Sequence, residues 1–260
     1  MRAMDRHQVE SLSYVGQSSE EGRIMSRRAR RVPATVAIIL AASGWAFPLA
    51  AHAAVPTCFG RPATMIGTNG PDSFSGDPYV TDVIVALGGN DFISGGRDYP
   101  TGAPDYICAG PGADYISGSS GADHILGGDG NDEMEGSFGG DYMDGNVGDD
   151  KVYDVDSEYE DVSDTLKGSQ GNDILYGDYG ADTLYGGDGA DHLTVGSCHD
   201  VQRLYGGPGN DRLEAWMFSY EGTSCAYTGV SDRVQGDGGF DTAIVNRADR
   251  VFTVEKRVNR

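Results

Sequence analysis

An aspartate recurs at nine-residue spacing through much of this chain, at the sixth place of glycine-rich units such as GGDGNDEME at 127–135. Carboxylates are hard oxygen ligands, and glycine lets backbone carbonyls crowd around one point because no side chain intervenes. Ca²⁺ accepts roughly six to eight oxygens in flexible geometry, whereas Mg²⁺ demands a small octahedron and keeps its waters. The spacing therefore predicts calcium coordination; the alternative is exposed Asp-Gly turns that bind nothing.

The units follow one another in register over two long stretches. They read AGPGADYIS, GSSGADHIL, GGDGNDEME, GSFGGDYMD and GNVGDDKVY over 109–153, and GSQGNDILY, GDYGADTLY and GGDGADHLT over 168–194. Isolated copies occur at 67–75, 206–214 and 236–244, and degenerate ones centre on Asp82, Asp91, Asp105, Asp164 and Asp232. The predicted calcium ligands are Asp72, Asp91, Asp114, Asp123, Asp132, Asp141, Asp150, Asp173, Asp182, Asp191, Asp211 and Asp241.

This pattern resembles the RTX, or hemolysin-type, calcium-binding nonapeptide repeat, G-G-x-G-x-D-x-U-x, over roughly residues 60–244. The resemblance implies an all-β fold, a right-handed parallel β-roll (a β-helix solenoid) in which two nonapeptides make one full turn. It also implies several Ca²⁺ ions as cofactors.

The last three residues of each unit should form a short strand whose middle side chain points inward. The predicted core is Ile107, Ile116, Ile125, Met134, Met143, Val152, Leu166, Leu175, Leu184, Leu193, Leu204 and Leu213. Such a core is thin, and aspartates stacked at about 4.8 Å repel by about 3–4 kcal/mol at an effective dielectric near 20. We therefore expect the roll to fold only when calcium binds.

The half-turns alternate between two edges of the predicted roll. Counted from Thr64 as zero, the odd edge holds Asp72, Asp91, Asp114, Asp132, Asp150, Asp173, Asp191, Asp211 and Asp241. The even edge holds Thr64, Asp82, Asp105, Asp123, Asp141, Asp164, Asp182, Gln202 and Asp232. All five insertions precede even half-turns, which predicts an unbroken calcium ladder on the odd edge and loops on the even edge. A further half-turn hidden between Asp211 and Asp232 would move Asp241 to the even edge.

The N-terminal region has a different composition. Residues 1–24 carry no targeting or folding pattern, and Met25 is a candidate start. Residues 25–53 show a basic, an apolar and a small-residue section ending in Ala51-His52-Ala53, which predicts a secretory signal peptide and a secreted, extracellular protein. A membrane anchor is the alternative, but Gly44, Trp45 and Pro48 shorten the apolar run. Beyond it we expect an N-terminal strap at 54–66, the roll at 67–244 and a C-terminal cap at 245–260.

Residues 54–260 contain 12 basic and 36 acidic residues, for a net charge of −24. Nucleic acid and anionic membranes are therefore poor partners, and cations are good ones. After signal cleavage no membrane span is expected. A cell-surface, carbohydrate or protein partner could bind the loops 97–104, 154–163 and 215–231.

Four cysteines in an exported chain favour two disulfides. Cys198 and Cys225 lie in insertions two half-turns apart on the same edge, so we pair them, which leaves Cys58 with Cys108. Free thiols or a metal site are the alternative, although no C-x-x-C spacing is present.

Motifs for catalysis are missing from the sequence. There is no H-E-x-x-H, no G-x-S-x-G and no glycine fingerprint after a strand, so we expect a structural or interaction role without enzymatic activity. A non-catalytic remnant or accessory of an RTX-type secreted hydrolase or toxin is an alternative, as is a carbohydrate- or surface-binding adhesin. The stretch DVDSEYE at 154–160 is similar to an EF-hand loop, but Tyr159 replaces the turn glycine, so we expect an acidic insertion that binds cations weakly.

Overall fold

A computed structural model describes residues 54–96, 102–155, 162–196, 200–215, 233–245, 250–254 and 256–259. The all-β fold predicted from the sequence is confirmed, because two ten-stranded parallel sheets stack as a β-solenoid. Within the described part of the chain, no helix has the length and apolar character needed to cross a bilayer.

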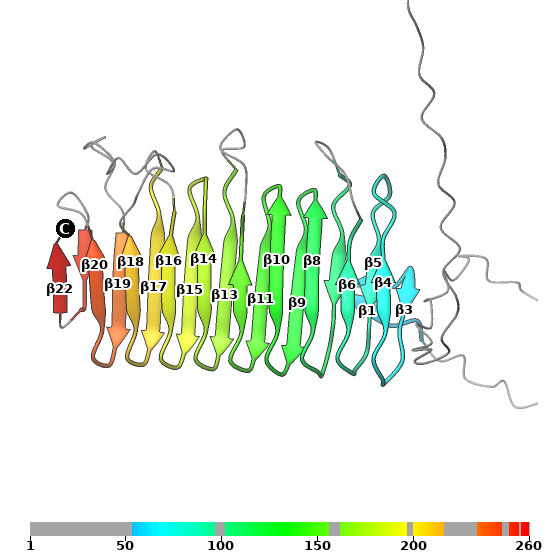
Figure 1. The fold of residues 1–260 in the computed structure, drawn as a ribbon, viewed down its shortest axis with the longest axis horizontal. Helices are drawn as coiled ribbons and strands as arrows, with labels where there is room; N and C mark the ends of the chain where they lie inside the picture. Colours follow the sequence, from blue (N-terminus) through cyan, green and yellow to red (C-terminus); the bar gives the residue numbers. More distant parts are fainter. Residues whose placement is uncertain are drawn as a thin grey trace, which may run out of the picture.

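The two sheets form opposite walls of the roll (Figure 1). Sheet A consists of β4 (Ser73–Ser75), β6 (Phe92–Ser94), β8 (Tyr115–Ser120), β10 (Glu133–Phe138), β12 (Lys151–Tyr153), β14 (Ile174–Gly177), β16 (His192–Val195), β18 (Arg212–Ala215), β20 (Thr242–Val245) and β22 (Lys256–Asn259). Sheet B consists of β3 (Met65–Ile66), β5 (Val83–Val85), β7 (Tyr106–Cys108), β9 (His124–Asp129), β11 (Tyr142–Val147), β13 (Thr165–Gln170), β15 (Thr183–Asp188), β17 (Arg203–Pro208), β19 (Arg233–Gly238) and β21 (Arg250–Phe252). Consecutive strands alternate between the sheets, so two nonapeptides make one turn.

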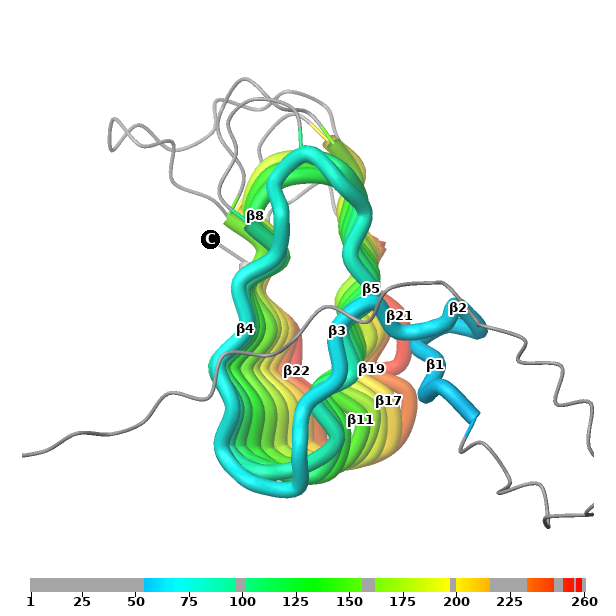
Figure 2. Tube along the Cα trace, turned by 90° about the vertical axis from the view of Figure 1, so that its right-hand side faces the viewer, coloured from blue at the N-terminus to red at the C-terminus, as the bar shows by residue number. Residues whose placement is uncertain are grey.

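Strand register follows the repeat. Met134 of β10 pairs with Ile116 of β8 on one side and with Val152 of β12 on the other. Partners are thus eighteen residues apart, and equivalent repeat positions stack directly above one another. Figure 2 shows this stack end-on, with the successive turns superimposed.

The core consists of two facing rows of apolar side chains, one row from each sheet. All twelve predicted core residues have a relative exposure of 0%. Met65 and Phe74 continue the rows at the N-terminal end, and Val234, Ala243 and Val245 continue them toward the other end. The predicted alternation of inward and outward side chains is therefore confirmed.

Glycine is required where one turn passes close to the next. Gly130, the fourth residue of its unit, has a φ of +130°, and a Cβ there would overlap the carbonyl oxygen of Gly112 one turn away. The second position is also left-handed, and besides glycine it is held by small polar residues such as Ser119 (φ 84°) and Asn146 (φ 73°). The glycine and small polar residues of the unit are thus explained by the positive φ angles and the close approach of successive turns.

The two edges differ in the length of their connections. On the odd edge, the lower one in Figure 1, short turns of similar size lead from sheet B to sheet A. The lengthened connections all lead from sheet A to sheet B, as predicted. Arg212 pairs with Thr242, so Asp211 and Asp241 are neighbours and Asp241 lies on the odd edge.

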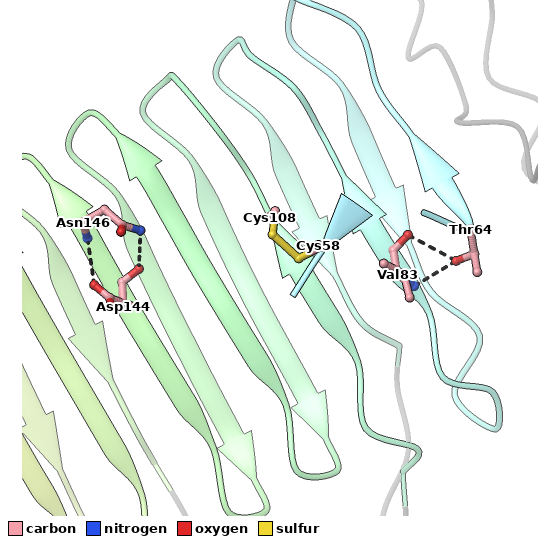
Figure 3. Close-up of a disulfide and its surroundings, with 6 residues drawn as sticks. All are labelled: Cys58, Thr64, Val83, Cys108, Asp144 and Asn146. Carbon is pink, nitrogen blue, oxygen red and sulfur yellow. Dashed lines mark hydrogen bonds between the residues drawn. A yellow bond between two sulfur atoms is a disulfide. The ribbon is translucent and has the colours of Figure 1, made fainter. Parts of the chain in front are cut away.

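A hairpin of β1 (Thr57–Cys58) and β2 (Arg61–Pro62) lies outside sheet B (Figure 2). The predicted Cys58–Cys108 disulfide is present, with a Cα–Cα distance of 5.7 Å, and ties this strap to β7 (Figure 3). The ring of Phe59 packs against the rings of Tyr106 and His124 at centroid distances of 6.0 and 5.3 Å. Cys198 and Cys225 lie outside the described residues.

Candidate metal centre

An aspartate column runs along each edge of the roll. In the odd-edge column, the main-chain N–H of each aspartate donates to Oδ1 of the aspartate one turn further on, at 2.7–3.0 Å from Asp72 to Asp241. The even-edge column repeats the arrangement from Asp82 to Asp182, at 2.7–3.1 Å. Each carboxylate is thereby held in one orientation by a turn that lies far away in the sequence.

The second carboxylate oxygen, Oδ2, has a different environment. In the interior of the columns it is buried, and for nine aspartates it has no hydrogen-bond partner within the described residues: Asp91, Asp114, Asp123, Asp132, Asp150, Asp164, Asp173, Asp191 and Asp211. These residues are 0–3% exposed. A buried carboxylate oxygen without a donor is costly unless a cation or a proton neutralises it.

Carbonyl oxygens converge on the same points. A Cβ on Gly118 would lie 2.5 Å from Asp123 Oδ2 and 3.0 Å from the carbonyl oxygen of Gly136, which belongs to the next turn. A Cβ on Gly127 would likewise overlap Asp132 Oδ2 and lie 2.9 Å from the carbonyl oxygen of Gly145. The glycine at the first position thus leaves room for a cradle lined by carboxylate and carbonyl oxygens.

Burial changes the acidity of these carboxylates. It raises the pKa of Asp132 from 3.8 to about 7, and the charges of Asp114 and Asp150 add to the rise. The pKa of Asp123 on the even edge is raised further, to about 9, again mainly by burial. An ionised column therefore requires a compensating positive charge.

These residues fit calcium. The donor set is made of hard oxygens, the carboxylates are pre-oriented, and the space beside them is free of side chains. A bound Ca²⁺ would neutralise the stacked carboxylates, and the interior aspartates of both columns would hold it together with the glycine carbonyls.

At the N-terminal end of each column, protein donors hydrogen-bond to the Oδ2 atom instead. Oδ2 of Asp72 accepts hydrogen bonds from the main-chain N–H and the hydroxyl of Thr68, at 2.6 and 2.9 Å. Oδ2 of Asp82 accepts one from the N–H of Asp77 at 2.7 Å. These two aspartates are therefore less suited to a cation than the interior ones.

Gln202 changes the even-edge column in another way. Its Oε1 accepts the N–H of Asp182 at 2.8 Å, as an aspartate Oδ1 does elsewhere. Its Nε2 donates to the carbonyl oxygen of Gly180, an oxygen that belongs to the turn. The NH₂ group of Gln202 thus supplies to the Gly180 carbonyl oxygen the positive partner that a cation would supply beside an aspartate.

The structure places all twelve aspartates predicted as ligands in the two columns, although Asp72 has the different environment just described. Asp105 and Asp164, which belong to degenerate units and were not predicted as ligands, occupy equivalent column positions. They could have been predicted as ligands from the sequence if the repeat had been aligned with a gap for the insertion before each. Asp154 lies beside the even-edge column; the sequence placed it only in an acidic insertion expected to bind cations weakly, not in a column.

A parallel solenoid with buried aspartate columns and glycine cradles defines a class: a β-roll built around cation sites. The family model of the RTX calcium-binding nonapeptide repeat (4 copies) matches residues 81–99, 109–143, 127–153, 161–193 and 202–216. The chain therefore contains RTX calcium-binding nonapeptide repeats, and the resemblance inferred from the sequence is confirmed. Comparison of the chain with curated proteins and with solved structures gave no match.

Proposed function

We propose that this chain is a secreted calcium-binding protein whose β-roll folds on calcium and serves a structural or interaction role. The observation that carries the proposal is the set of nine buried Oδ2 atoms in the interior of the columns, which have no hydrogen-bond partner within the described residues and lie near glycine carbonyls. Because the core is narrow, with two facing rows of apolar side chains, apolar burial opposes this uncompensated charge only weakly.

Far-ultraviolet circular dichroism of the purified chain tests this proposal. In excess chelator at pH 8 we expect the strand signal to be lost, and on titration with calcium we expect its cooperative return at roughly sub-millimolar to millimolar concentration, as in extracellular calcium modules. Magnesium at the same concentration is the matched control and should not restore the signal. An unchanged strand spectrum in excess chelator would contradict the proposal.

We further propose that the chain has no catalytic activity. The support is negative and comes from the sequence, which carries none of the motifs of metalloproteases, α/β-hydrolases or dinucleotide-binding enzymes. The test is a screen of the calcium-loaded chain against peptide, ester, lipid and glycoside substrates. Reproducible calcium-dependent turnover would favour a hydrolase relative instead.

Secretion is proposed from the predicted signal peptide at 25–53. Expression of the whole chain in a bacterial host with an export pathway tests it. N-terminal sequencing of exported protein should begin near residue 54. Retention of the unprocessed chain in the cell would contradict this part of the proposal.

A second candidate function is carbohydrate binding, favoured by an open groove of about 850 Å³ on sheet A. The rings of Phe92 and Tyr115 stack in it at 5.2 Å with an interplanar angle of 5°, and they are 52% and 39% exposed. Serines surround them: Ser73, Ser75, Ser94, Ser117, Ser119, Ser120 and Ser137. Aromatic faces cover the apolar face of a sugar, and hydroxyls exchange hydrogen bonds with its hydroxyl groups.

A glycan array probed with the calcium-loaded protein tests this second function. The double variant Phe92→Ala/Tyr115→Ala should lose any binding detected. The control is Tyr185→Ala/Tyr205→Ala, which removes another stacked pair, at 4.9 Å on sheet B, that is not part of the groove. Binding that survives in the first variant, or no binding by the wild type, would remove this candidate.

A further inference from the structure

Asp154 occupies a repeat position that no other acidic residue takes in the described part of the chain. It follows β12 directly, at the first position of a half-turn, where the neighbouring turns of sheet A have Gly136 and Gly177. Its N–H donates to the carbonyl oxygen of Tyr176 at 2.8 Å, so its backbone keeps the register of the roll. The residue is 0% exposed. A carboxylate has therefore been placed where the repeat normally has no side chain.

The Asp154 side chain reaches toward the even-edge column. A Cβ on Gly136 would lie 2.6 Å from Asp154 Oδ1 and would also overlap Asp141 Oδ2, so both oxygens border the same first-position space. One carboxylate oxygen from each of Asp141, Asp154 and Asp164 lies within 4.8 Å of the others. All three residues are buried. The turn between Asp141 and Asp164 thus collects three carboxylates.

An independent observation points to a ligand at this place. Asp164 is 2% exposed, its Oδ1 accepts the N–H of Asp141 at 2.7 Å, and its buried Oδ2 has no hydrogen-bond partner. No packing requirement explains Asp154, because glycine serves at the same position in the turns on either side. Three buried carboxylates held this close need a cation or a proton among them.

We propose that Asp154 is an added ligand, so that the turn between Asp141 and Asp164 forms a calcium site with three carboxylates. This site would have the highest calcium affinity on the even edge. This inference rests on the proposed function, because it assumes that the columns bind calcium. Ligand charge is one of the features that set calcium affinity, so a third carboxylate strengthens binding relative to levels with two. The site lies where the acidic insertion begins, and it would join Asp154 at the start of the insertion to Asp164 directly after it.

Calorimetric calcium titration of the full chain and of Asp154→Asn and Asp154→Gly tests the inference. Asp154→Gly restores the residue that the repeat has in adjacent turns and so preserves the fold. Each variant should lose one ion from the tightest class or bind it about tenfold or more weakly. The control is Asp144→Asn, which removes a carboxylate on sheet B whose Oδ1 accepts the Ser169 hydroxyl at 2.7 Å, outside the columns; it should match the wild type.

Circular dichroism in saturating calcium confirms that each variant is folded before the comparison. Wild-type affinities and stoichiometry in both Asp154 variants would overturn the inference while leaving the proposed function intact. A wild-type chain that binds no calcium would instead defeat the proposed function itself. If Asp154→Asn fails to fold at any calcium concentration, the titration of Asp154→Gly decides.

Discussion

The two edges of the roll are built from the same nonapeptide yet differ in continuity. The odd-edge column runs from Asp72 to Asp241 with short connections throughout, and each described aspartate pair shares one N–H to Oδ1 bond. The even-edge column is interrupted by insertions, gains Asp154 and loses a carboxylate at Gln202. The odd edge thus has an unbroken column of candidate calcium ligands, whereas the even-edge column differs from one turn to the next.

This difference shows what each edge contributes. A continuous column allows each ion to bridge two turns, so that neighbouring sites support one another. Insertions leave the register of the sheets unchanged, because the strands on both sides of each insertion still pair with their neighbours. The odd edge is therefore expected to provide stability, while the even edge has room for sequence variation.

The largest expected effect is that of removing a carboxylate from the middle of the odd-edge column. Asp132→Ala should raise the calcium concentration at the folding midpoint by about tenfold or more, because the turns on both sides lose a ligand. Asp123→Ala, on the even edge, should raise it less. Calcium titrations followed by circular dichroism measure both midpoints. Equal midpoints for the two variants would abolish the distinction between the edges.

A backbone variant separates the interior of the odd edge from its end. Gly130→Ala places a Cβ against the Gly112 carbonyl in a left-handed conformation and should destabilise the calcium-bound fold by about 2 kcal/mol or more. Gly70→Ala is the control at the same repeat position: its backbone does not have a positive φ, and its Cβ would approach only Thr68 Oγ1, at 3.9 Å. Urea unfolding in saturating calcium compares them. Similar losses of unfolding free energy in both variants would show that neither the contact with Gly112 nor the positive φ of Gly130 determines the destabilisation.

The raised pKa values predict how pH affects both edges. In the folded, calcium-free chain burial raises the pKa of Asp132 to about 7 and that of Asp123 to about 9, above the 3.8 expected for each in the unfolded chain. Protonation therefore stabilises the calcium-free roll at low pH, and this stabilisation is lost as pH rises through about 7 to 9. In chelator, the strand signal should be stronger at pH 4.5 than at pH 8.

Where low pH keeps the calcium-free roll folded, calcium must displace these protons, so its apparent affinity should fall as pH decreases. We expect the calcium midpoint to rise by about tenfold or more between pH 7.5 and pH 5.5, with proton release on binding. Midpoints measured at constant ionic strength check this expectation. A midpoint independent of pH would show that the carboxylates are already ionised in the calcium-free state.

The smallest expected effect concerns the C-terminal part of the even edge. Gln202→Asp replaces the amide that donates to the Gly180 carbonyl with a carboxylate, and it should add one calcium ion. Calorimetric stoichiometry measures the change, and Gln202→Ala controls for loss of the amide alone. An unchanged ion count would mean that Gly180 and Asp182 need more than a second carboxylate to form a site.

Most of the fold could be predicted from local patterns in the sequence. The nine-residue period places Ile116, Met134 and Val152 one above another, since two units make one turn, and the spacing of the insertions assigns them to one edge. The pairing of Cys58 with Cys108 followed once the other two cysteines were assigned to one edge. These features depend only on counting residues along a regular solenoid.

The tertiary structure alone decided which column positions differ from the rule. The Thr68 hydroxyl donates to Asp72 Oδ2, and the Gln202 amide donates to the Gly180 carbonyl oxygen. Neither contact can be predicted from the spacing of the repeat. Asp154 reads in sequence as the start of an acidic insertion, but the stacking of turns buries it beside Asp141. The physical reason is that the spacing of the repeat determines which residues stack, while the partner of each second carboxylate oxygen depends on donors and oxygens brought together from different turns.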